Sequence, residues 1–403
     1  MKYTIKSFIA SDGERFSQLY EAEAPGFPLF YPTAFITRHI RSNSTHETQK
    51  AYLSAIRLVC EWESKNNIDL ALSFHKRKFL SAAQIDDLAN HLRSKKSKAK
   101  GSVISSAKFN IYLAYAEKYI RWLAQEVITE KNSTNVKLAI NEQSEALKGK
   151  KRRKAGSKSA NQRRILAENL NEGARRQLLE LFVAPFQLTQ NPQDHGARLR
   201  NIVMLRVLYD TGMRSGELLG LKLINFIEAS GGDSAYLDIE RNHHDKFDTR
   251  TNQPVAKTLG RRLPITEELE AQIKEYRDNW RAEINGVGFS GENFLFVVHR
   301  GGRNQGRALT KSALDCGLAH LKNIFPALKS VHPHLLRHDW NYRFSETAEA
   351  MNLSDEEERT HREQLMGWIT GSNMSKIYNQ RHIQEKSHEI GLKVASDTAR
   401  PKR

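Results

Sequence analysis

Cysteine and long apolar runs are both scarce in this sequence. Its 403 residues include two cysteines, Cys60 and Cys316, which lie far apart and form no Cys-x-x-Cys pair. This scarcity argues against a disulfide framework and against a structural zinc site. No run of about 18 apolar residues occurs, so we expect no membrane-spanning helix. The first residues lack the basic and then apolar profile of a signal peptide. We therefore expect a cytoplasmic protein.

Negative charge is also in short supply. The chain has 63 lysines and arginines against 46 aspartates and glutamates, a formal net charge of +17. Such a balance suits a polyanionic partner, because each phosphate neutralised by Lys or Arg releases counterions. Ribosomal, membrane-surface and heparin-binding proteins can be basic as well. Charge alone therefore favours nucleic acid as the partner without identifying it.

The N-terminal part of the chain is predicted to hold a small helical domain. An apolar content of 39% is enough for more than one packed core, and the length favours about two domains. Residues 1–35 are interpreted as an N-terminal extension, because a short strand near Tyr3 is followed by three prolines that oppose regular structure. Helical periodicity then predicts an all-α domain over residues 36–130. Within it, Ser81 and Gln84 have the spacing of a capping box.

A basic segment separates this domain from the second one. Residues 148–164 contain many lysines and arginines and no acidic residue. Such a run repels itself and cannot bury a core, so we expect a basic linker over residues 131–164. A second domain then covers residues 165–385, and residues 386–403 form a C-terminal tail.

The second domain is predicted to be helical with a few short strands. Helical patterns cover roughly residues 165–183 and 196–226, with an interruption near Gly212, and helices return from Glu267 to the C-terminus. Short strands are expected at residues 235–239, around Lys257 and at residues 262–265. The predicted fold is therefore mainly α with one small antiparallel sheet, an α+β architecture.

Two groups of basic residues are candidates for contacts with nucleic acid. One lies between two helices of the first domain and the other lies in the linker, and either group could instead be an ordinary solvated segment. A basic loop or strap on a small domain is also a common way to hold phosphates. The candidates are Lys95, Lys96, Lys98, Lys100, Lys150, Lys151, Arg152 and Arg153.

Two basic residues of the second domain lie at local positions suited to chemistry. Arg214 stands in TGMRSGELLGLK, where it follows a glycine bend and precedes a helical pattern. An arginine at a helix start lies beside free N–H groups, a good place to hold a phosphate. Lys257 precedes a glycine-containing turn between two expected strands. Taken alone, Arg214 is more readily an ordinary surface arginine, and a lysine near a turn is common enough to be a weak signal.

The motif HPHLLRH, residues 332–338, predicts a helix start that presents a histidine and an arginine together. His334 and Arg337 are three positions apart, which makes them neighbours on one helical turn, and Pro333 suits the first helical position. Three nearby histidines invite a metal site, but no carboxylate or cysteine set completes one. A structural pair between histidine and arginine is the alternative.

A glycine–tryptophan pair precedes a tyrosine near the C-terminus. Trp368 lies ten residues before Tyr378 in LMGWITGSNMSKIYNQRH. Left alone, this tyrosine would be interpreted as a half-buried packing residue.

Taken together, these motifs resemble the catalytic signature of the tyrosine recombinase, or phage integrase, family. The resemblance covers roughly residues 165–385, and it extends loosely to residues 40–130, which look like that family's core-binding domain. It implies a helical core-binding domain followed by a catalytic domain. The residues that carry it, in order, are Arg214, Lys257, His334, Arg337, Trp368 and Tyr378.

The resemblance implies a role for each of these residues. Tyr378 would attack a DNA phosphate and carry a 3′-phosphotyrosyl link. Arg214 and Arg337 would brace the doubly negative transition state through bidentate hydrogen bonds. A tyrosine with an ordinary pKa near 10 is mostly protonated at neutral pH, so His334 is the candidate for proton handling.

Two further positions of this signature carry less specific roles. The resemblance gives Lys257 the task of protonating the leaving 5′-oxygen, although Lys246 could occupy a neighbouring position. Trp368 stands where many relatives have histidine, and its indole N–H can orient a phosphate but cannot shuttle a proton. The residues that follow His338 are bulkier than expected, and residues 353–363 form an acidic insertion.

The resemblance also implies partners and cofactors. Double-stranded DNA is the expected partner, with a homotetramer on paired sites, and neither a cofactor nor a metal ion is expected. The enzyme would act on DNA at the nucleoid of a bacterial or phage-type system. A transposase or resolvase with the same chemistry is an alternative, as is an inactive DNA-binding relative. Ile390, Leu392 and Val394 lead us to expect that the tail docks on a protein surface.

Overall fold

The computed structural model describes two compact units. Their bounds are Met1–Ser157 and Lys158–Arg403. The structure describes residues 2–23, 26–94, 102–130, 133–153, 169–189 and 191–396. Each unit is described separately below.

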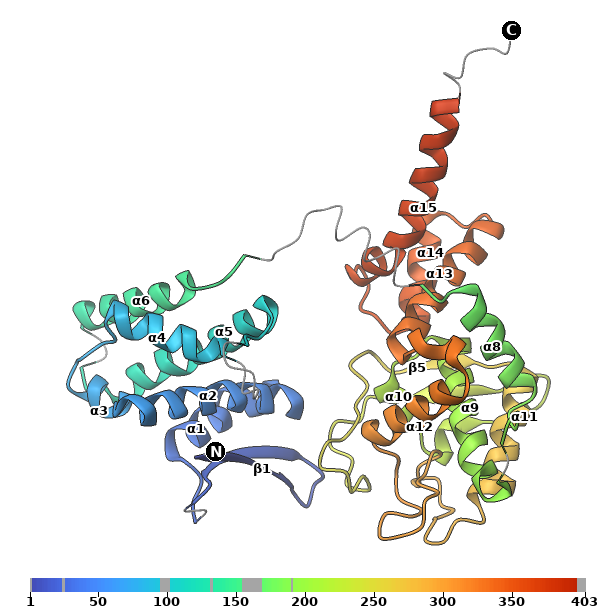
Figure 1. Cartoon of the computed structure of the whole chain (residues 1–403), viewed down its shortest axis with the longest axis horizontal. Helices are drawn as coiled ribbons and strands as arrows, with labels where there is room; N and C mark the ends of the chain where they lie inside the picture. The colour runs from blue at the N-terminus through green and yellow to red at the C-terminus, as the bar shows by residue number, and fades with distance from the viewer. Residues whose placement is uncertain are drawn as a thin grey trace. The chain divides into compact units, whose positions relative to one another are not determined.

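The first unit is a helical bundle with a β-hairpin on it (Figure 1). Strands β1 (Tyr3–Ile9) and β2 (Arg15–Glu21) pair antiparallel and pack against helix α2. The helices are α1 (Phe30–Phe35), α2 (His46–Asn66), α3 (Leu70–His75), α4 (Ala82–Arg93), α5 (Ser106–Val127) and α6 (Thr134–Gly149). The expected capping box at the start of α4 is confirmed, since the Ser81 and Gln84 side chains each bond the other's backbone N–H.

Two local expectations for the first unit need correction. The first residues form a complete hairpin rather than one short strand, and Pro32 lies inside α1, because proline is tolerated in a first helical turn. The expectation of an extended linker does not hold for residues 134–149. They form α6, which buries Val136, Ile140 and Leu147 against the rest of the unit.

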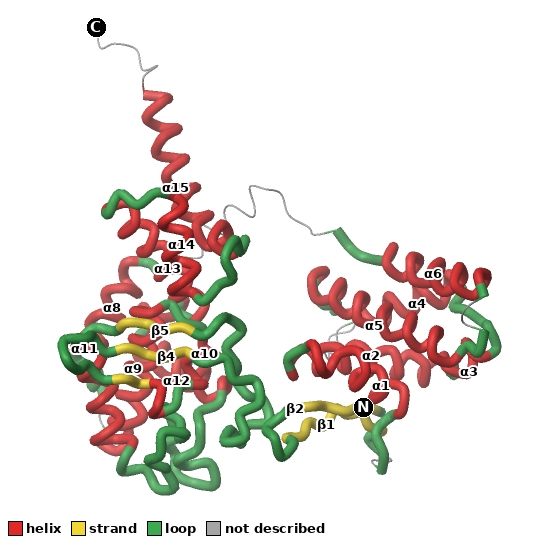
Figure 2. The backbone as a smooth tube through the Cα atoms, turned by 180° about the vertical axis from the view of Figure 1, so that it is seen from behind, coloured by secondary structure: helices red, strands yellow, loops and turns green. Residues whose placement is uncertain are grey.

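The second unit surrounds a small sheet with helices, as the sequence predicts. Strands β3 (Phe226–Ile227), β4 (Tyr236–Ile239) and β5 (Arg261–Pro264) form an antiparallel sheet in the order β3-β4-β5, and Figure 2 shows them side by side. The helices before the sheet are α8 (Glu172–Val183), α9 (His195–Thr211) and α10 (Ser215–Gly220). Those after it are α11 (Glu267–Glu275), α12 (Lys311–Ile324), α13 (Pro333–Ala350), α14 (Asp355–Met366) and α15 (Met374–Ser396).

The strand expected around Lys257 is wrong. Residues 240–260 form a long connection between β4 and β5, and Lys257 lies in it without strand pairing. The backbone beyond Lys257 bonds elsewhere instead, because the Leu259 N–H donates to the Gly367 carbonyl at the end of α14 (2.9 Å). The acidic insertion of residues 353–363 has a structural explanation. It supplies the capped, acid-rich first turns of α14, a charge pattern that favours a helix N-terminus.

The described residues contain no helix that is long and apolar enough to cross a membrane. Among the same residues, no group of three histidine, cysteine or carboxylate side chains is placed to hold a metal ion.

Candidate active site

Three segments of the second unit that are distant in sequence place aromatic and basic side chains in one cluster. Arg337 lies in the first turns of α13, Trp368 directly follows α14, and Tyr378 lies near the start of α15. The Arg337 Cζ atom is 5.5 Å from the centre of the Tyr378 ring and 5.6 Å from that of Trp368. The two aromatic rings stack with their centres 5.3 Å apart. The structure therefore brings these three predicted residues together.

Arg214 joins this cluster from the N-terminus of α10. It is the N-cap residue of that helix, as its position after the glycine bend predicts. Its positive charge lowers the pKa of Arg337. Burial is the larger cause of that shift, and together they bring the Arg337 pKa down to about 10. The Arg337 guanidinium remains protonated at neutral pH, and because it is buried, little water screens its positive charge.

Several N–H groups of this cluster are buried without a hydrogen-bond acceptor. They belong to Arg214 (Nη1), Arg337 (Nε and Nη2) and Trp368 (Nε1). A buried donor without a partner costs about 1–3 kcal/mol, so native proteins rarely leave several in one place. Two of the three side chains are cationic, and a bound oxyanion would satisfy all of these donors. The arrangement is therefore suited to a phosphate.

The Arg337 guanidinium is held in place by a turn that only glycine accommodates. Arg337 is 1% exposed, and its Nη1 donates to the Gly212 carbonyl at 2.7 Å. Gly212 ends α9 with a φ of +62°, and a Cβ there would lie 2.7 Å from the Trp340 ring. Trp340 in turn donates its indole N–H to the Asp210 carbonyl (2.9 Å). Trp340, one of the large residues that follow His338, therefore packs against the turn that leads to Arg214 and stabilises it.

The neighbouring residues of α13 are also engaged. Asp339 is fully buried and forms ion pairs with Arg175 (2.8 Å) and Arg343 (2.9 Å). Asn341 donates to the carbonyl of Arg337 at 2.8 Å. These contacts account for the polar and bulky residues that follow the His-x-x-Arg motif in this chain.

Glu217 is a functional position that the sequence reasoning missed. Its carboxylate accepts from the Arg214 backbone N–H (2.9 Å), the Thr258 hydroxyl (2.6 Å) and Arg261 Nη2 (2.8 Å). Burial raises the pKa of Glu217, but Arg261 and these hydrogen bonds outweigh it and lower the pKa to about 2. Arg214 Nη1 lies 3.6 Å from the same carboxylate. The available signal was its place three residues after the N-cap of α10, where a glutamate bonds back to the N-cap.

Lys257 immediately precedes Thr258, whose hydroxyl is bonded to this carboxylate. Its side chain is exposed, while the following Thr258 is buried and bonded to Glu217. Leu259 is bonded to Gly367, which immediately precedes Trp368. The backbone on one side of Lys257 is therefore fixed between the Arg214 and Trp368 segments. Lys246 is also exposed, with its Nζ atom 5.1 Å from the ring of Phe247.

Two histidines, not one, lie against Tyr378. Pro333 begins α13 as predicted, and His334 is exposed one turn before His338. The His334 ring centre lies 6.3 Å from that of Tyr378, whereas His338 is closer at 4.7 Å. The two Nε2 atoms are 3.0 Å apart, so one histidine donates to the other. Burial, with the nearby His334 and Arg337, lowers the pKa of His338 to about 4.

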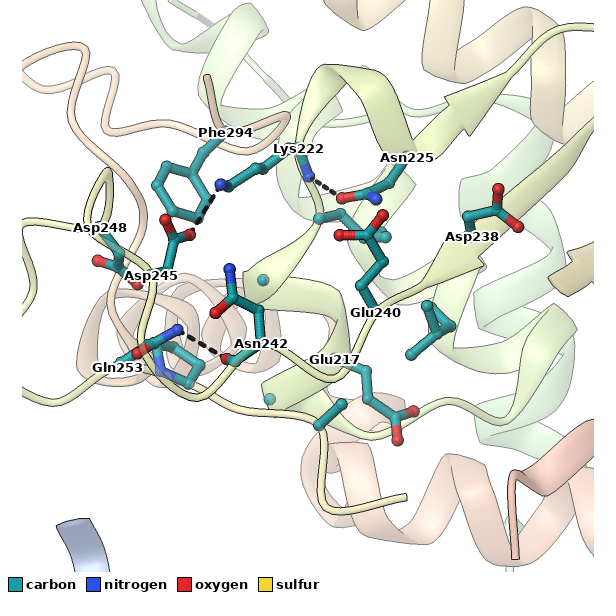
Figure 3. A pocket seen from close by; sticks show the side chains of 16 residues that line it. Glu217, Lys222, Asn225, Asp238, Glu240, Asn242, Asp245, Asp248, Gln253 and Phe294 are labelled. Carbon is teal, nitrogen blue, oxygen red and sulfur yellow. Dashed lines mark hydrogen bonds and ion pairs between the residues drawn. The ribbon is translucent and has the colours of Figure 1, made fainter. Parts of the chain in front are cut away.

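A pocket on the far side of Glu217 is acidic and unlike the cluster around Tyr378 (Figure 3). Asp238, Glu240, Asp245 and Asp248 line it. The buried Lys222 bridges Asp245 (2.9 Å) and Glu292 (2.6 Å). This pocket does not suit a phosphate. Its contacts instead attach the connection between β4 and β5 to the end of α10.

The predicted DNA-contacting basic residues have mixed outcomes. Lys95, Lys96, Lys98 and Lys100 lie outside the described residues. Lys150 forms an ion pair with Asp86 (2.6 Å). The remaining three, Lys151, Arg152 and Arg153, are exposed, and the Arg152 backbone is bonded to the side chain of Asn110. Their contact with DNA stays a prediction.

Comparison with known proteins gives a family match and a fold match. Residues 186–381 match the model of the phage integrase family. Over 147 residues the chain is 31% identical to tyrosine recombinase XerC of Roseiflexus sp. (strain RS-1). The matched segment covers 36% of this chain and only 38% of that relative. A crystal structure of the XerH site-specific recombinase bound to difH substrate, a pre-cleavage complex, matches with a TM-score of 0.53 at 16% identity. That match covers 91% of this chain and 86% of the other.

A second crystal structure of XerH, the post-cleavage complex with palindromic difH substrate, matches with a TM-score of 0.49 at 17% identity. It covers 88% of this chain and 82% of the other. The pre-cleavage match establishes a shared fold for this chain.

Proposed function

We propose that this chain is a site-specific DNA recombinase with Tyr378 as its nucleophile, because residues 186–381 match the model of the phage integrase family. One observation carries the proposal. Buried N–H donors without acceptors occur on Arg337 and Trp368, which both lie against the buried Tyr378, and on Arg214, whose charge acts on Arg337. Such a site binds an oxyanion next to a nucleophile, which is the requirement for attack on a phosphodiester.

In the proposed cleavage step, the protein and the DNA supply every atom and proton that is exchanged. The Tyr378 oxygen bonds to phosphorus, and the bond from phosphorus to the 5′-oxygen breaks. The tyrosine proton passes to His334, and the leaving oxygen takes a proton from Lys257, as the resemblance implies. The two guanidiniums stabilise the charge that develops on the phosphate oxygens. Attack by a 5′-hydroxyl in the reverse direction rejoins the strand.

This route stores the energy of the broken bond in the phosphotyrosyl link. Rejoining therefore needs no ATP, and the positive charge that a metal would supply comes from arginine. The proposal expects cleavage to persist in excess EDTA. The corresponding assembly is a tetramer on two DNA sites.

The tail is proposed to hold such an assembly together. The C-terminal part of α15 projects from the rest of its own unit (Figure 1). It exposes Ile390, Leu392 and Val394, each about 60% exposed. Deleting residues 386–403 should weaken assembly on DNA more than it weakens DNA binding. Equal loss of both would contradict docking by the tail.

A suicide substrate tests the proposed chemistry. The substrate is DNA from the junctions that flank the gene, with a nick near the cleavage position. After cleavage the short fragment that carries the 5′-hydroxyl diffuses away. Rejoining is then impossible, and the covalent intermediate accumulates. After digestion, mass spectrometry should find the nucleotide on the peptide that contains Tyr378. Tyr378→Phe should abolish the adduct, whereas the control Tyr342→Phe should retain it. An adduct on another residue, or none with DNA that the protein binds, refutes the proposal.

A further inference from the structure

Residues 296–309 fold back on themselves as two short arms joined by the β-bridge between Val297 and Ala308, and this segment is here called the arginine ribbon. The Leu309 N–H donates to the Phe296 carbonyl (3.1 Å) and the Val298 N–H to the Arg307 carbonyl (2.9 Å). Its tip is a built turn, since the Gly306 N–H donates to the Val298 carbonyl (2.9 Å). Gly306 has a φ of +71°, and a Cβ there would lie 2.7 Å from the backbone of Gly286. The ribbon is thus a defined structure rather than a loose loop.

The ribbon carries three exposed arginines with no acidic counterpart. Arg300, Arg303 and Arg307 are exposed, and no aspartate or glutamate occurs between Glu292 and Asp315. In the described part of the chain, no hydrogen bond or ion pair involves these three side chains. Other arginines of this unit, such as Arg250 with Asp248, are bonded. Three neighbouring guanidiniums repel one another, so their concentration on one turn favours a polyanionic partner.

The root of the ribbon is attached to the helix that presents Arg214. The Leu295 N–H donates to the Leu221 carbonyl at 2.9 Å, just after α10. The Arg250 guanidinium bonds both the Leu219 and the Leu309 carbonyls, which ties α10 to the end of the ribbon. Helix α10 has six residues and is therefore about 9 Å long. Duplex DNA carries one charge per about 1.7 Å of its axis, so a duplex that covers both Arg214 and the ribbon would present several phosphates to the ribbon.

We propose that the arginine ribbon binds the phosphates of duplex DNA beside the cleavage position, with Arg300 and Arg303 at its tip and Arg307 on its stem. The inference rests on the proposed function for its partner. It adds a second DNA-holding element that is separate from the residues around Tyr378.

The test measures how binding depends on salt. The full chain and the variant Arg300→Gln/Arg303→Gln/Arg307→Gln are titrated with a short fluorescent duplex of arbitrary sequence at several salt concentrations. The slope of log K against log salt should become shallower by about 0.9 for each phosphate that the variant no longer neutralises, or about 2.7 for three. Extrapolated from 1 M to 0.15 M salt, this corresponds to an affinity decrease on the order of 100-fold.

A matched variant controls for the change in net charge. Arg176→Gln/Lys322→Gln/Lys329→Gln removes three charges from α8 and the region at the far end of α12, a helix of 14 residues and so about 21 Å long. It should leave the slope nearly unchanged. Equal slopes for wild type and the ribbon variant, or equally reduced slopes in both variants, overturn the proposal.

The covalent assay separates this proposal from the proposed function. At saturating protein, the ribbon variant should still form the Tyr378 adduct, because the ribbon does not contribute to the cluster. If wild type forms no adduct but the ribbon variant alone lowers the slope, the proposed chemistry fails and the ribbon assignment stands.

Discussion

Replacing Glu217 tests whether one buried carboxylate holds the candidate site together. Its pKa is lowered from 4.5 to about 2. At 1.36 kcal/mol per pKa unit, the ionised form contributes roughly 3 kcal/mol to stability. Because the folded pKa is depressed, this contribution is complete above the unfolded pKa of 4.5 and is lost as pH falls toward 2. By pH 3.5, roughly half should be lost.

Glu217→Gln should remove both the stabilisation and its pH dependence. At neutral pH the variant leaves the Arg261 side chain, 1% exposed, without its anion. Breaking a buried pair in this way costs about 3–5 kcal/mol. The control Glu228→Gln also removes an ion-paired carboxylate, but that side chain is 39% exposed. It should cost about 1 kcal/mol or less.

Urea unfolding of the full chain at pH 7 and pH 3.5, monitored by circular dichroism, measures the unfolding free energies of wild type and both variants. Hydrogen exchange of peptides from α9 and α10 assigns the change to the second unit. The difference in unfolding free energy between wild type and Glu217→Gln should be smaller at pH 3.5 than at pH 7 by roughly 1.5 kcal/mol. The reasoning fails if the gap is the same at both pH values, or if Glu217→Gln is as mild as Glu228→Gln.

Substitutions at three further positions probe the site. Arg337→Lys should slow formation of the covalent adduct by about 100- to 1000-fold, because it loses the bidentate fork, and a rate within a few fold of wild type would contradict this. His338→Phe should slow adduct formation more than His338→Gln, because only glutamine can keep a hydrogen bond to His334. Single-turnover rates of adduct formation over a pH series measure the difference. Equal rates for the two variants would contradict a role for this hydrogen bond. Gly212→Ala should lower the unfolding free energy by more than the about 1 kcal/mol that a positive φ costs, because its Cβ also meets the Trp340 ring. The control Gly231→Ala has a similar φ of +61° but open space around the added Cβ. Thermal unfolding compares the two variants, and equal destabilisation would refute the packing argument.

Local patterns in the sequence predicted much of the fold. Pro333 marks the start of α13, and Ser81 with Gln84 marks the start of α4, because these signals act within one helical turn. The prediction of a linker over residues 131–164 missed the helix at residues 134–149. Val136, Ile140 and Leu147 recur there at helical spacing, so the sequence did carry the signal. The basic run that begins at Lys148 marks where this helix ends rather than where the linker begins upstream.

The candidate site was predicted as a set of residues but not as a network. Arg214, Arg337, Trp368 and Tyr378 were identified from motifs, and the structure brings them together. The motifs could not show that Glu217 links two of the segments, because its partners Thr258 and Arg261 are more than 40 positions away. The closeness of His338 to Tyr378 likewise depends on how α13 and α15 cross.

Two of the attachments of the connection between β4 and β5 are at Arg250, which bonds the carbonyls of Leu219 and Leu309, and at Thr258, which bonds Glu217. Only seven residues separate these two anchors. A stretch fastened at both ends tolerates changes of side chain far better than insertions or deletions. Relatives that keep both anchors should therefore vary in composition across residues 251–257 while conserving the length of that span, and an inserted residue would move Lys257 before it disturbed anything else.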